Sequence, residues 1–280
     1  MQECQYEGRI SHRPKPCLSA FNAENVALTG FGVLDGCGAP WWAAQRARTL
    51  ANGRPYLLHF ENVTHLRVCG VQLRNSPAWT VHPLNCVDVL IEDVSICNPY
   101  NSPNTDGINP ESCRDVRILN CRVDVGDDCI TLKSGTEETP SPAPCENIVI
   151  ANCLLVHGHG GIVIGSEMSG GVRNVTVTNC VFTGTDRGLR VKTRRRRGGC
   201  VENLRLSNLV MERVFCPFVF NMYYSCGTAE KDRWVWEKTP YPVDGGTPAF
   251  RNIRINGVTV VGATRRRVSS TVWPKALSMA

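Results

Sequence analysis

A short phrase recurs eight times along the chain, and it constrains the fold more than any other feature. Each copy has a polar residue, often Asn, then apolar residues that alternate with polar ones. The copies begin at Asn25, Asn62, Cys86, Asp115, Asn147, Asn174, Asn203 and Asn252. Alternation with a period of two, rich in Val and Ile, predicts strands. A unit this short cannot bury its apolar face alone, so the copies are expected to stack on one another.

Stacked strand repeats predict an all-β, single-stranded parallel β-helix in which each repeat forms one coil. We expect one domain over residues 1–280, with coils from about residue 25 to residue 262 and an irregular tail over 263–280. We find no stretch of helical periodicity. A β-propeller is the structural alternative, but its blades of about 40–45 residues fit the irregular intervals between copies poorly.

The register of the repeats predicts two ladders of side chains. Four residues beyond the first apolar position lie Asn120, Asn152, Asn179 and Asn208, and the next position gives Cys121, Cys153 and Cys180. Asn tolerates left-handed backbone and can hydrogen-bond along a stack. Coils about 4.8 Å apart would also allow disulfides between the cysteines. Without an export signal, we expect the 15 cysteines to be reduced and packed as small apolar side chains.

A second recurring phrase carries three aspartates. Its equivalent positions are Asp106, Asp128, Gly160 and Arg187, at intervals of 22, 32 and 27 residues. Two positions further on lie Ile108, Ile130, Ile162 and Leu189, which we expect to point inward. Asp127 and His159 each precede one of the equivalent positions, and Arg190 and Lys192 fall on the outward face. Stacking therefore predicts a patch of three acids, one histidine and two bases.

Such a patch is typical of a catalytic site, because like charges held close raise at least one pKa and are costly without a use. The alternative is turn chemistry, since Asp and Asn favour bends. Arg194–Arg197 stays open between a solvated loop and a patch that draws in a polyanion.

Four ordered phrases at coil spacing resemble the polygalacturonase family of glycoside hydrolases, family 28. They are N-T-D (Asn104–Asp106), D-D (Asp127–Asp128), G-H-G (Gly158–Gly160) and R-x-K (Arg190–Lys192). The likeness runs from about Gly8 to about Gly262 and implies a right-handed parallel β-helix. Members usually begin with a capping segment and continue beyond the last repeat, so we expect this chain to be truncated at both ends.

The resemblance implies an inverting mechanism, with Asp127 as general acid and Asp106 with Asp128 activating water. Two ionised carboxylates beside a third should keep the third protonated, so we expect a raised pKa at Asp127. His159 is expected to orient Asp127 or to contact the substrate.

We expect Arg190 and Lys192 to bind the carboxylate of a uronic acid, as a planar fork and a point charge respectively. Asn104 and Glu167 complete the predicted substrate-binding set, and we identify no metal ligand and no cofactor. The resemblance thus predicts hydrolysis of α-1,4-galacturonosidic bonds in polygalacturonate or pectin oligosaccharides. Three stretches resembling exo-acting bacterial members, among them Gly165–Gly171, favour action at a chain end.

The net charge of +6 fits an acidic partner, and the resemblance selects an acidic polysaccharide over nucleic acid. We find neither an apolar run of about 20 residues nor a signal peptide. We therefore expect no membrane association and a cytoplasmic location for the chain as given, or secretion if a leader precedes it. The oligomeric state is left open.

Two rival functions are considered. A calcium-dependent pectate lyase shares the fold and the acidic polymer, and clustered aspartates can bind Ca²⁺. A non-catalytic carbohydrate-binding β-helix would bind the polymer without releasing reducing ends.

Overall fold

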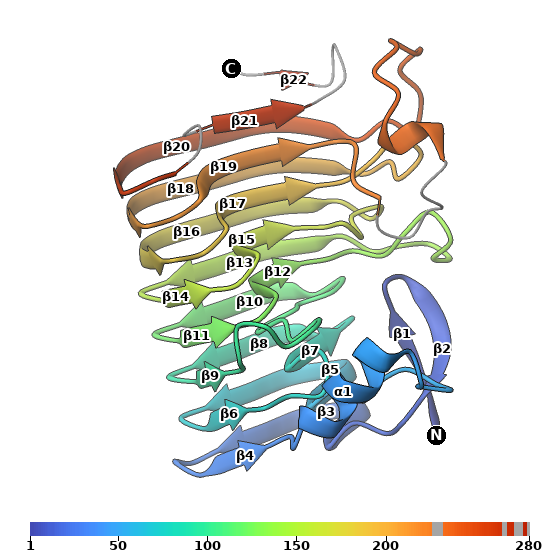
Figure 1. Cartoon of the computed structure of the whole chain (residues 1–280), viewed down its shortest axis with the longest axis vertical. Coiled ribbons are helices and arrows are strands. Elements are labelled where there is room, and N and C mark those ends of the chain that lie inside the picture. The colour runs from blue at the N-terminus through green and yellow to red at the C-terminus, as the bar shows by residue number, and fades with distance from the viewer. Residues whose placement is uncertain (226–231, 265–267, 272–276, 279–280) are drawn as a thin grey trace.

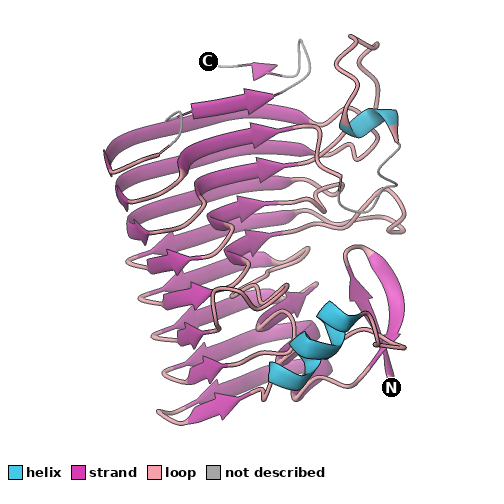
Figure 2. Ribbon diagram, viewed as in Figure 1, coloured by secondary structure: helices cyan, strands magenta, loops and turns pink. Residues whose placement is uncertain are grey.

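The chain winds into a stack of coils, and the strands of successive coils lie side by side, stacked along one axis and running across it (Figure 1). This computed structural model describes residues 1–225, 232–264, 268–271 and 277–278. Parallel pairing joins each coil to the next, from β3 with β5 at one end to β19 with β21 at the other. The predicted parallel β-helix is confirmed, and Figure 2 shows how little helix accompanies it.

The strands form three rows along the axis. The longest row holds β3 (Leu18–Thr29), β5 (Leu58–Cys69), β8 (Val87–Glu92), β10 (Arg114–Leu119), β13 (Cys145–Ala151), β16 (Val172–Thr183), β18 (Cys200–Glu212), β20 (Ala249–Val261) and β22 (Leu277–Ser278). A second row holds β4 (Val33–Asp35), β6 (Gln72–Arg74), β9 (Ser95–Cys97), β11 (Arg122–Val125) and β14 (Leu154–His157). The third row, which carries the site, holds β7 (Val81–Leu84), β12 (Asp128–Leu132), β15 (Gly160–Ile164), β17 (Arg187–Lys192), β19 (Cys216–Asn221) and β21 (Val268–Thr271).

The register predicted for the third row is confirmed. Ile108 pairs with Ile130, Ile130 with Ile162, and Ile162 with Leu189. All four side chains are buried in the core that runs along the axis. Asp128 therefore lies opposite Gly160, so residues far apart in sequence meet on one outward face.

The predicted asparagine ladder is also present. Asn152 donates to Asn120 at 3.1 Å, Asn179 to Asn152 at 3.3 Å, and Asn208 to Asn179 at 2.7 Å. All four have a left-handed backbone, with φ between 53° and 58°. The turn thus needs a residue that accepts positive φ, and Asn supplies that together with a side-chain amide for the stack.

The cysteines that the structure describes are free, as expected. Cys121, Cys153 and Cys180 stack in the coil interior and are each at most 2% exposed. They act as small apolar residues in the core.

The structure departs from the sequence prediction in three respects. Helix α1 (Ala39–Ala47) lies beside the first coils and buries Trp42, whose indole donates to the Ser76 carbonyl. It has only nine residues and a proline in its first turn, too short for a periodic signal. The coils begin at Leu18 rather than near residue 25. Strands β21 and β22 lie within the segment that we expected to be irregular.

A hairpin and a short 3₁₀ turn lie outside the three rows. Strands β1 (Gln2–Tyr6) and β2 (Arg9–Arg13) form an antiparallel hairpin, and η1 (Arg233–Val235) is one 3₁₀ turn. Within the described ranges, no helix is long and apolar enough to cross a membrane.

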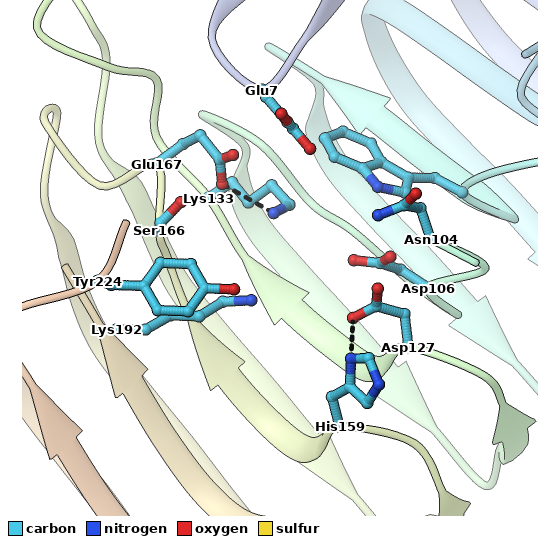
Figure 3. Close-up of a pocket in the computed structure, with 11 residues that line it drawn as sticks. Glu7, Asn104, Asp106, Asp127, Lys133, His159, Ser166, Glu167, Lys192 and Tyr224 are labelled. Atoms are coloured by element: carbon cyan, nitrogen blue, oxygen red, sulfur yellow. Dashed lines mark hydrogen bonds and ion pairs between the residues drawn. The ribbon is translucent and has the colours of Figure 1, made fainter. Parts of the chain in front are cut away.

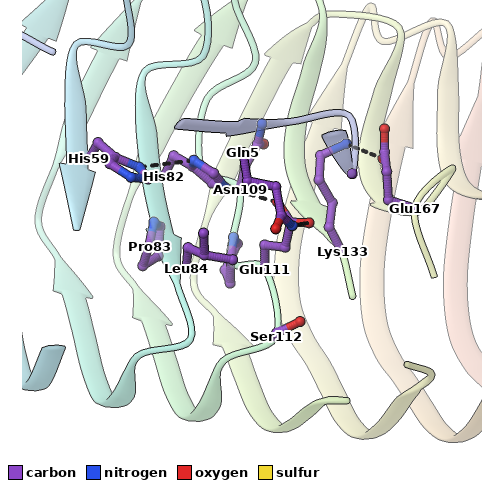
Figure 4. Close-up of polar contacts among 12 residues, drawn as sticks. Gln5, His59, His82, Pro83, Leu84, Asn109, Glu111, Ser112, Lys133 and Glu167 are labelled. Carbon is purple, nitrogen blue, oxygen red and sulfur yellow. Dashed lines mark hydrogen bonds and ion pairs between the residues drawn. The ribbon is translucent and has the colours of Figure 1, made fainter. Parts of the chain in front are cut away.

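A row of polar side chains lies buried on the outward face beneath this hairpin (Figure 4). His59 and His82 hydrogen-bond through their Nδ1 atoms at 3.1 Å, and His82 Nε2 donates to Glu111 at 3.0 Å. The amide of Gln5, on the hairpin, donates to the other Glu111 oxygen at 2.5 Å. The hairpin therefore excludes water from strand positions that would otherwise be solvated.

Burial, together with the charges of His59 and Lys133, lowers the pKa of His82 to about 4 against the opposing effect of Glu111. The unfolded chain takes up a proton near pH 6.5. The folded chain does so only near pH 4, so stability falls between these values as the pH drops. The 2.5 pH units correspond to about 3 kcal/mol of unfolding free energy.

Between pH 7 and pH 4, we expect the unfolding free energy of the wild type to fall by about 3 kcal/mol more than that of His82→Gln. Urea denaturation at each pH measures the difference. His157→Gln, which removes an exposed histidine bonded to Asp124, is the control and should follow the wild type. A constant difference between wild type and His82→Gln across this range would contradict the assignment.

Candidate active site

A cavity of about 210 Å³ opens on the outward face of the third row, between the hairpin and the loop after β19 (Figure 3). Its walls come from six coils and from the hairpin turn. The lining residues are Glu7, Trp79, Asn104, Asp106, Asp127, Lys133, His159, Ser166, Glu167, Lys192 and Tyr224. Six of the eight predicted site residues are among them, so the stack brings the predicted patch together as expected from the register.

The three aspartates form a compact carboxylate cluster. One oxygen from each of Asp106, Asp127 and Asp128 lies within 4.8 Å of the others. Asn109 Nδ2 donates to Asp106 at 3.1 Å and fixes its orientation. Asp106 and Asp128 are buried, whereas the Asp127 side chain keeps 16% of its surface exposed to the cavity.

Asp128 is held by the two predicted uronate ligands. Lys192 Nζ lies 2.6 Å from Asp128 Oδ2, and the Arg190 guanidinium lies 3.5 Å from Oδ1. The charge of Asp128 helps raise the pKa of Lys192 to about 12 although burial opposes it. Tyr224 lies over both cations, 5.2 Å from Arg190 and 5.1 Å from Lys192. In the free protein these cations neutralise a buried acid.

His159 contacts the predicted general acid directly, as expected. Its Nδ1 lies 3.1 Å from Asp127 Oδ1, and this hydrogen bond raises the pKa of His159 although burial opposes it. Burial alone would raise the pKa of Asp127. The hydrogen bond from His159 and the charges of Lys192 and Lys133 together bring it below the ordinary value.

The expected raised pKa at Asp127 is therefore wrong for the free protein. Burial raises the pKa of Asp106 well above its ordinary range, and Asp127 and Asp128 raise it further against Lys133 and Lys192. Asp106 is more deeply buried than Asp127, and the Asn109 amide that contacts it carries no charge to offset its own. Asp127 instead forms a hydrogen bond with His159. Burial and partner, rather than the number of charges, decide which carboxyl holds the proton.

Glu167 is paired with a lysine to which sequence analysis gave no role. Lys133 Nζ lies 2.8 Å from Glu167 Oε2, and both side chains are buried. Although burial opposes ionisation, the Lys133 charge helps lower the pKa of Glu167 to about 2. Lys133 also lies over the Trp79 ring at 4.7 Å. Its outward register, the same as that of Lys192, is the signal that could have identified it.

Asn104 owes its position to an arginine that the sequence does not single out. Arg54, only 2% exposed, donates to Asn104 Oδ1 at 2.5 Å and to the Pro77 carbonyl at 3.0 Å. Asn104 has φ 52°, which Asn accepts more readily than most residues. Arg54 therefore fixes the loop that carries Asp106.

Three of the four residues of Arg194–Arg197 are buried and do not form a solvated loop. Arg194 and Arg197 both form ion pairs with Glu137, the latter at 3.3 Å. Arg195 donates to the Pro242 carbonyl at 2.8 Å. Their contacts tie together the loops beside the site.

The parallel β-helix brings carboxyls, a histidine and buried cations together in one open cavity. This combination is typical of a glycoside hydrolase that acts on an anionic sugar. Carboxyl groups supply the acid and the base that glycosidic cleavage requires. The cations suit an anionic sugar.

Comparison with known proteins makes the assignment specific. Residues 3–233 match the family described as Glycosyl hydrolases family 28. A "Probable polygalacturonase" of Vitis vinifera is 36% identical over 201 residues, which cover 70% of this chain and 41% of that protein. An "Endo-polygalacturonase" of Pectobacterium carotovorum is 32% identical over 233 residues, covering 78% and 56%. The chain belongs to glycoside hydrolase family 28.

A solved structure agrees with this membership. The exopolygalacturonase of Thermotoga maritima superposes with a TM-score of 0.77 at 30% identity, over 94% of this chain and 64% of that one. The chain thus spans about half the length of the curated relatives it matches. Relatives named as exo- and as endo-acting are both found, so membership alone does not fix the mode of action.

Proposed function

We propose that this protein hydrolyses α-1,4-galacturonosidic bonds in polygalacturonate or its oligosaccharides, releasing sugar from a chain end. The observation that carries this proposal is the cluster of Asp106, Asp127 and Asp128, within 4.8 Å, beside buried Lys192 and Arg190. The cluster supplies acid–base chemistry, and the cations suit a substrate with one carboxylate on each ring.

In the proposed mechanism, Asp106 and Asp127 share one proton. With the proton on Asp127, this acid protonates the leaving glycosidic oxygen. Asp106, now ionised, acts with Asp128 to take a proton from the water that attacks the anomeric carbon. The step leaves Asp106 protonated and Asp127 ionised, which is the distribution favoured in the free protein. Return of the proton from Asp106 to Asp127 resets the site.

We propose inversion at the anomeric carbon, following the family resemblance. The carboxylate oxygens lie closer together than the about 6.5–9.5 Å usual between carboxyls of inverting enzymes. Water must therefore enter beside Asp106 and Asp128 rather than between two widely spaced groups. Proton NMR of the first product from trigalacturonate is expected to show the β-anomer before mutarotation. An initial α-anomer would contradict inversion.

Digestion of polygalacturonate, followed by analysis of the products, distinguishes action at a chain end from internal cleavage. It also tests the rival functions. We expect galacturonate monomer as the product from the earliest times, whereas a ladder of oligomers would mean internal cleavage. A product absorbing in the ultraviolet, with loss of activity on chelation, would instead indicate a calcium-dependent pectate lyase. Polymer binding without new reducing ends would indicate a non-catalytic β-helix.

A further inference from the structure

The N-terminal hairpin inserts an acidic side chain into the cavity. Its turn residue Glu7 lines the cavity near Lys133 and Glu167, at the end away from His159 (Figure 3). Sequence analysis gave Glu7 no role. It lies about 100 residues before the first catalytic aspartate.

The hairpin is held firmly in this position. Tyr6 stacks on Trp79 with ring centroids 4.8 Å apart. The Arg13 guanidinium lies over the Tyr6 ring, 3.7 Å from its centroid. Gln5 is bonded to buried Glu111, and the Tyr56 hydroxyl donates to the Gln5 carbonyl. These contacts leave the turn little freedom to withdraw.

The turn itself fits tightly against the rim. Gly8 has φ +75°, and a Cβ added there would lie 2.0 Å from Thr136. Thr136 and Thr139 each donate to the Gly8 carbonyl at 3.4 Å. A side chain at this position would be strained and would clash with Thr136, so glycine lets the turn next to Glu7 lie against the rim.

Glu7 has a backbone conformation that does not favour glutamate. Its φ of 50°, followed by the positive φ of Gly8, makes a two-residue turn for which Asn-Gly is preferred. Among the described residues, none forms a hydrogen bond or ion pair with the Glu7 carboxylate. Burial raises its pKa, and so does the nearby charge of Glu167, against the opposing charges of Lys133, Arg13 and Lys192. The hairpin thus keeps an unpaired carboxyl in the cavity at some cost to local stability.

We propose that Glu7 and Glu167 form the closed end wall of the cavity and select the terminal sugar of the substrate. This inference rests on the proposed function. Carboxylates accept hydrogen bonds from the hydroxyls of a terminal ring. A polymer that continued past this wall would bring another uronate against two carboxylates and the hairpin backbone, and like charges disfavour that arrangement. Glu7 is thus a specificity-determining residue for chain-end action.

Two substitutions test the carboxylate without endangering the fold. Glu7→Gln keeps the size and removes the charge, and Glu7→Asn suits the turn better than the natural residue. Glu3→Gln, at an exposed acid on the same hairpin, is the matched control. Loss of a hydrogen bond to a charged acceptor should lower kcat/KM on trigalacturonate about tenfold or more in both Glu7 variants. Both variants also remove one of the two charges that repel a continuing chain, so the share of oligomers released from polygalacturonate should rise, while the control keeps the wild-type product pattern.

A binding measurement separates failure of this inference from failure of the proposed function. Calorimetric titration with digalacturonate should show about tenfold weaker binding to both Glu7 variants than to the wild type and Glu3→Gln. This holds even if turnover is absent, an outcome that would reject only the hydrolytic function. Unchanged binding and products in both variants would overturn the role of Glu7. A wild type that binds no digalacturonate would overturn both proposals.

Discussion

Replacing Asp127 with Asn is expected to lower turnover on polygalacturonate by about 10²- to 10⁴-fold, the usual contribution of one general acid. The amide keeps the size and polarity of the side chain but has no proton to transfer to the leaving oxygen. His159, 3.1 Å away, remains in place, so the cavity should keep its shape. Reducing-sugar release by the purified variant measures the loss.

Asp124→Asn is the matched control, because Asp124 is an acid of the same coil that pairs with His157 outside the cavity. It should retain wild-type turnover. The Asp106→Asn/Asp127→Asn double variant should lose less than the product of the single losses, because the two carboxyls share one proton. Near-wild-type turnover of a folded Asp127→Asn protein would show that another group is the acid.

Replacing Lys192 with Met is expected to lower the free energy of unfolding by about 3–5 kcal/mol, the usual cost of leaving a buried charge without its partner. The ammonium lies 2.6 Å from Asp128, which is completely buried, and Arg190 reaches the same carboxylate only at 3.5 Å. Methionine fills the space of the lysine stem but cannot neutralise the acid. Urea denaturation at pH 7 measures the change.

Lys238→Met, at an exposed lysine, serves as the control and should change stability little. Adding Asp128→Asn to Lys192→Met should restore part of the lost stability, since both members of the pair are then neutral. A Lys192→Met protein as stable as the wild type would mean that Asp128 is neutral or solvated in the folded chain.

The repeat pattern was sufficient to predict the coils and their register. Alternation along each strand depends only on which face of that strand is buried, so each copy of the repeat shows it in its own residues. Aligning the copies placed Asp106 beside Asp128 and stacked Asn120 on Asn152, and both placements are confirmed. The predicted site residues meet because residues one coil apart in sequence occupy adjacent strands of the same sheet.

The raised pKa of Asp106 and the position of Glu7 at the end of the cavity depend on the tertiary structure. The pKa of a carboxyl depends on its depth and on every charge around it, and neither quantity appears in the spacing of the motif. The hairpin docks through single contacts, such as Tyr6 on Trp79, which have no repeat and leave no periodic signal. The sequence by itself determined the coils and the gathering of the acids, because periodicity encodes stacking. Only the folded chain decided how deeply each acid is buried and where the cavity ends, because both depend on contacts between segments with no shared pattern.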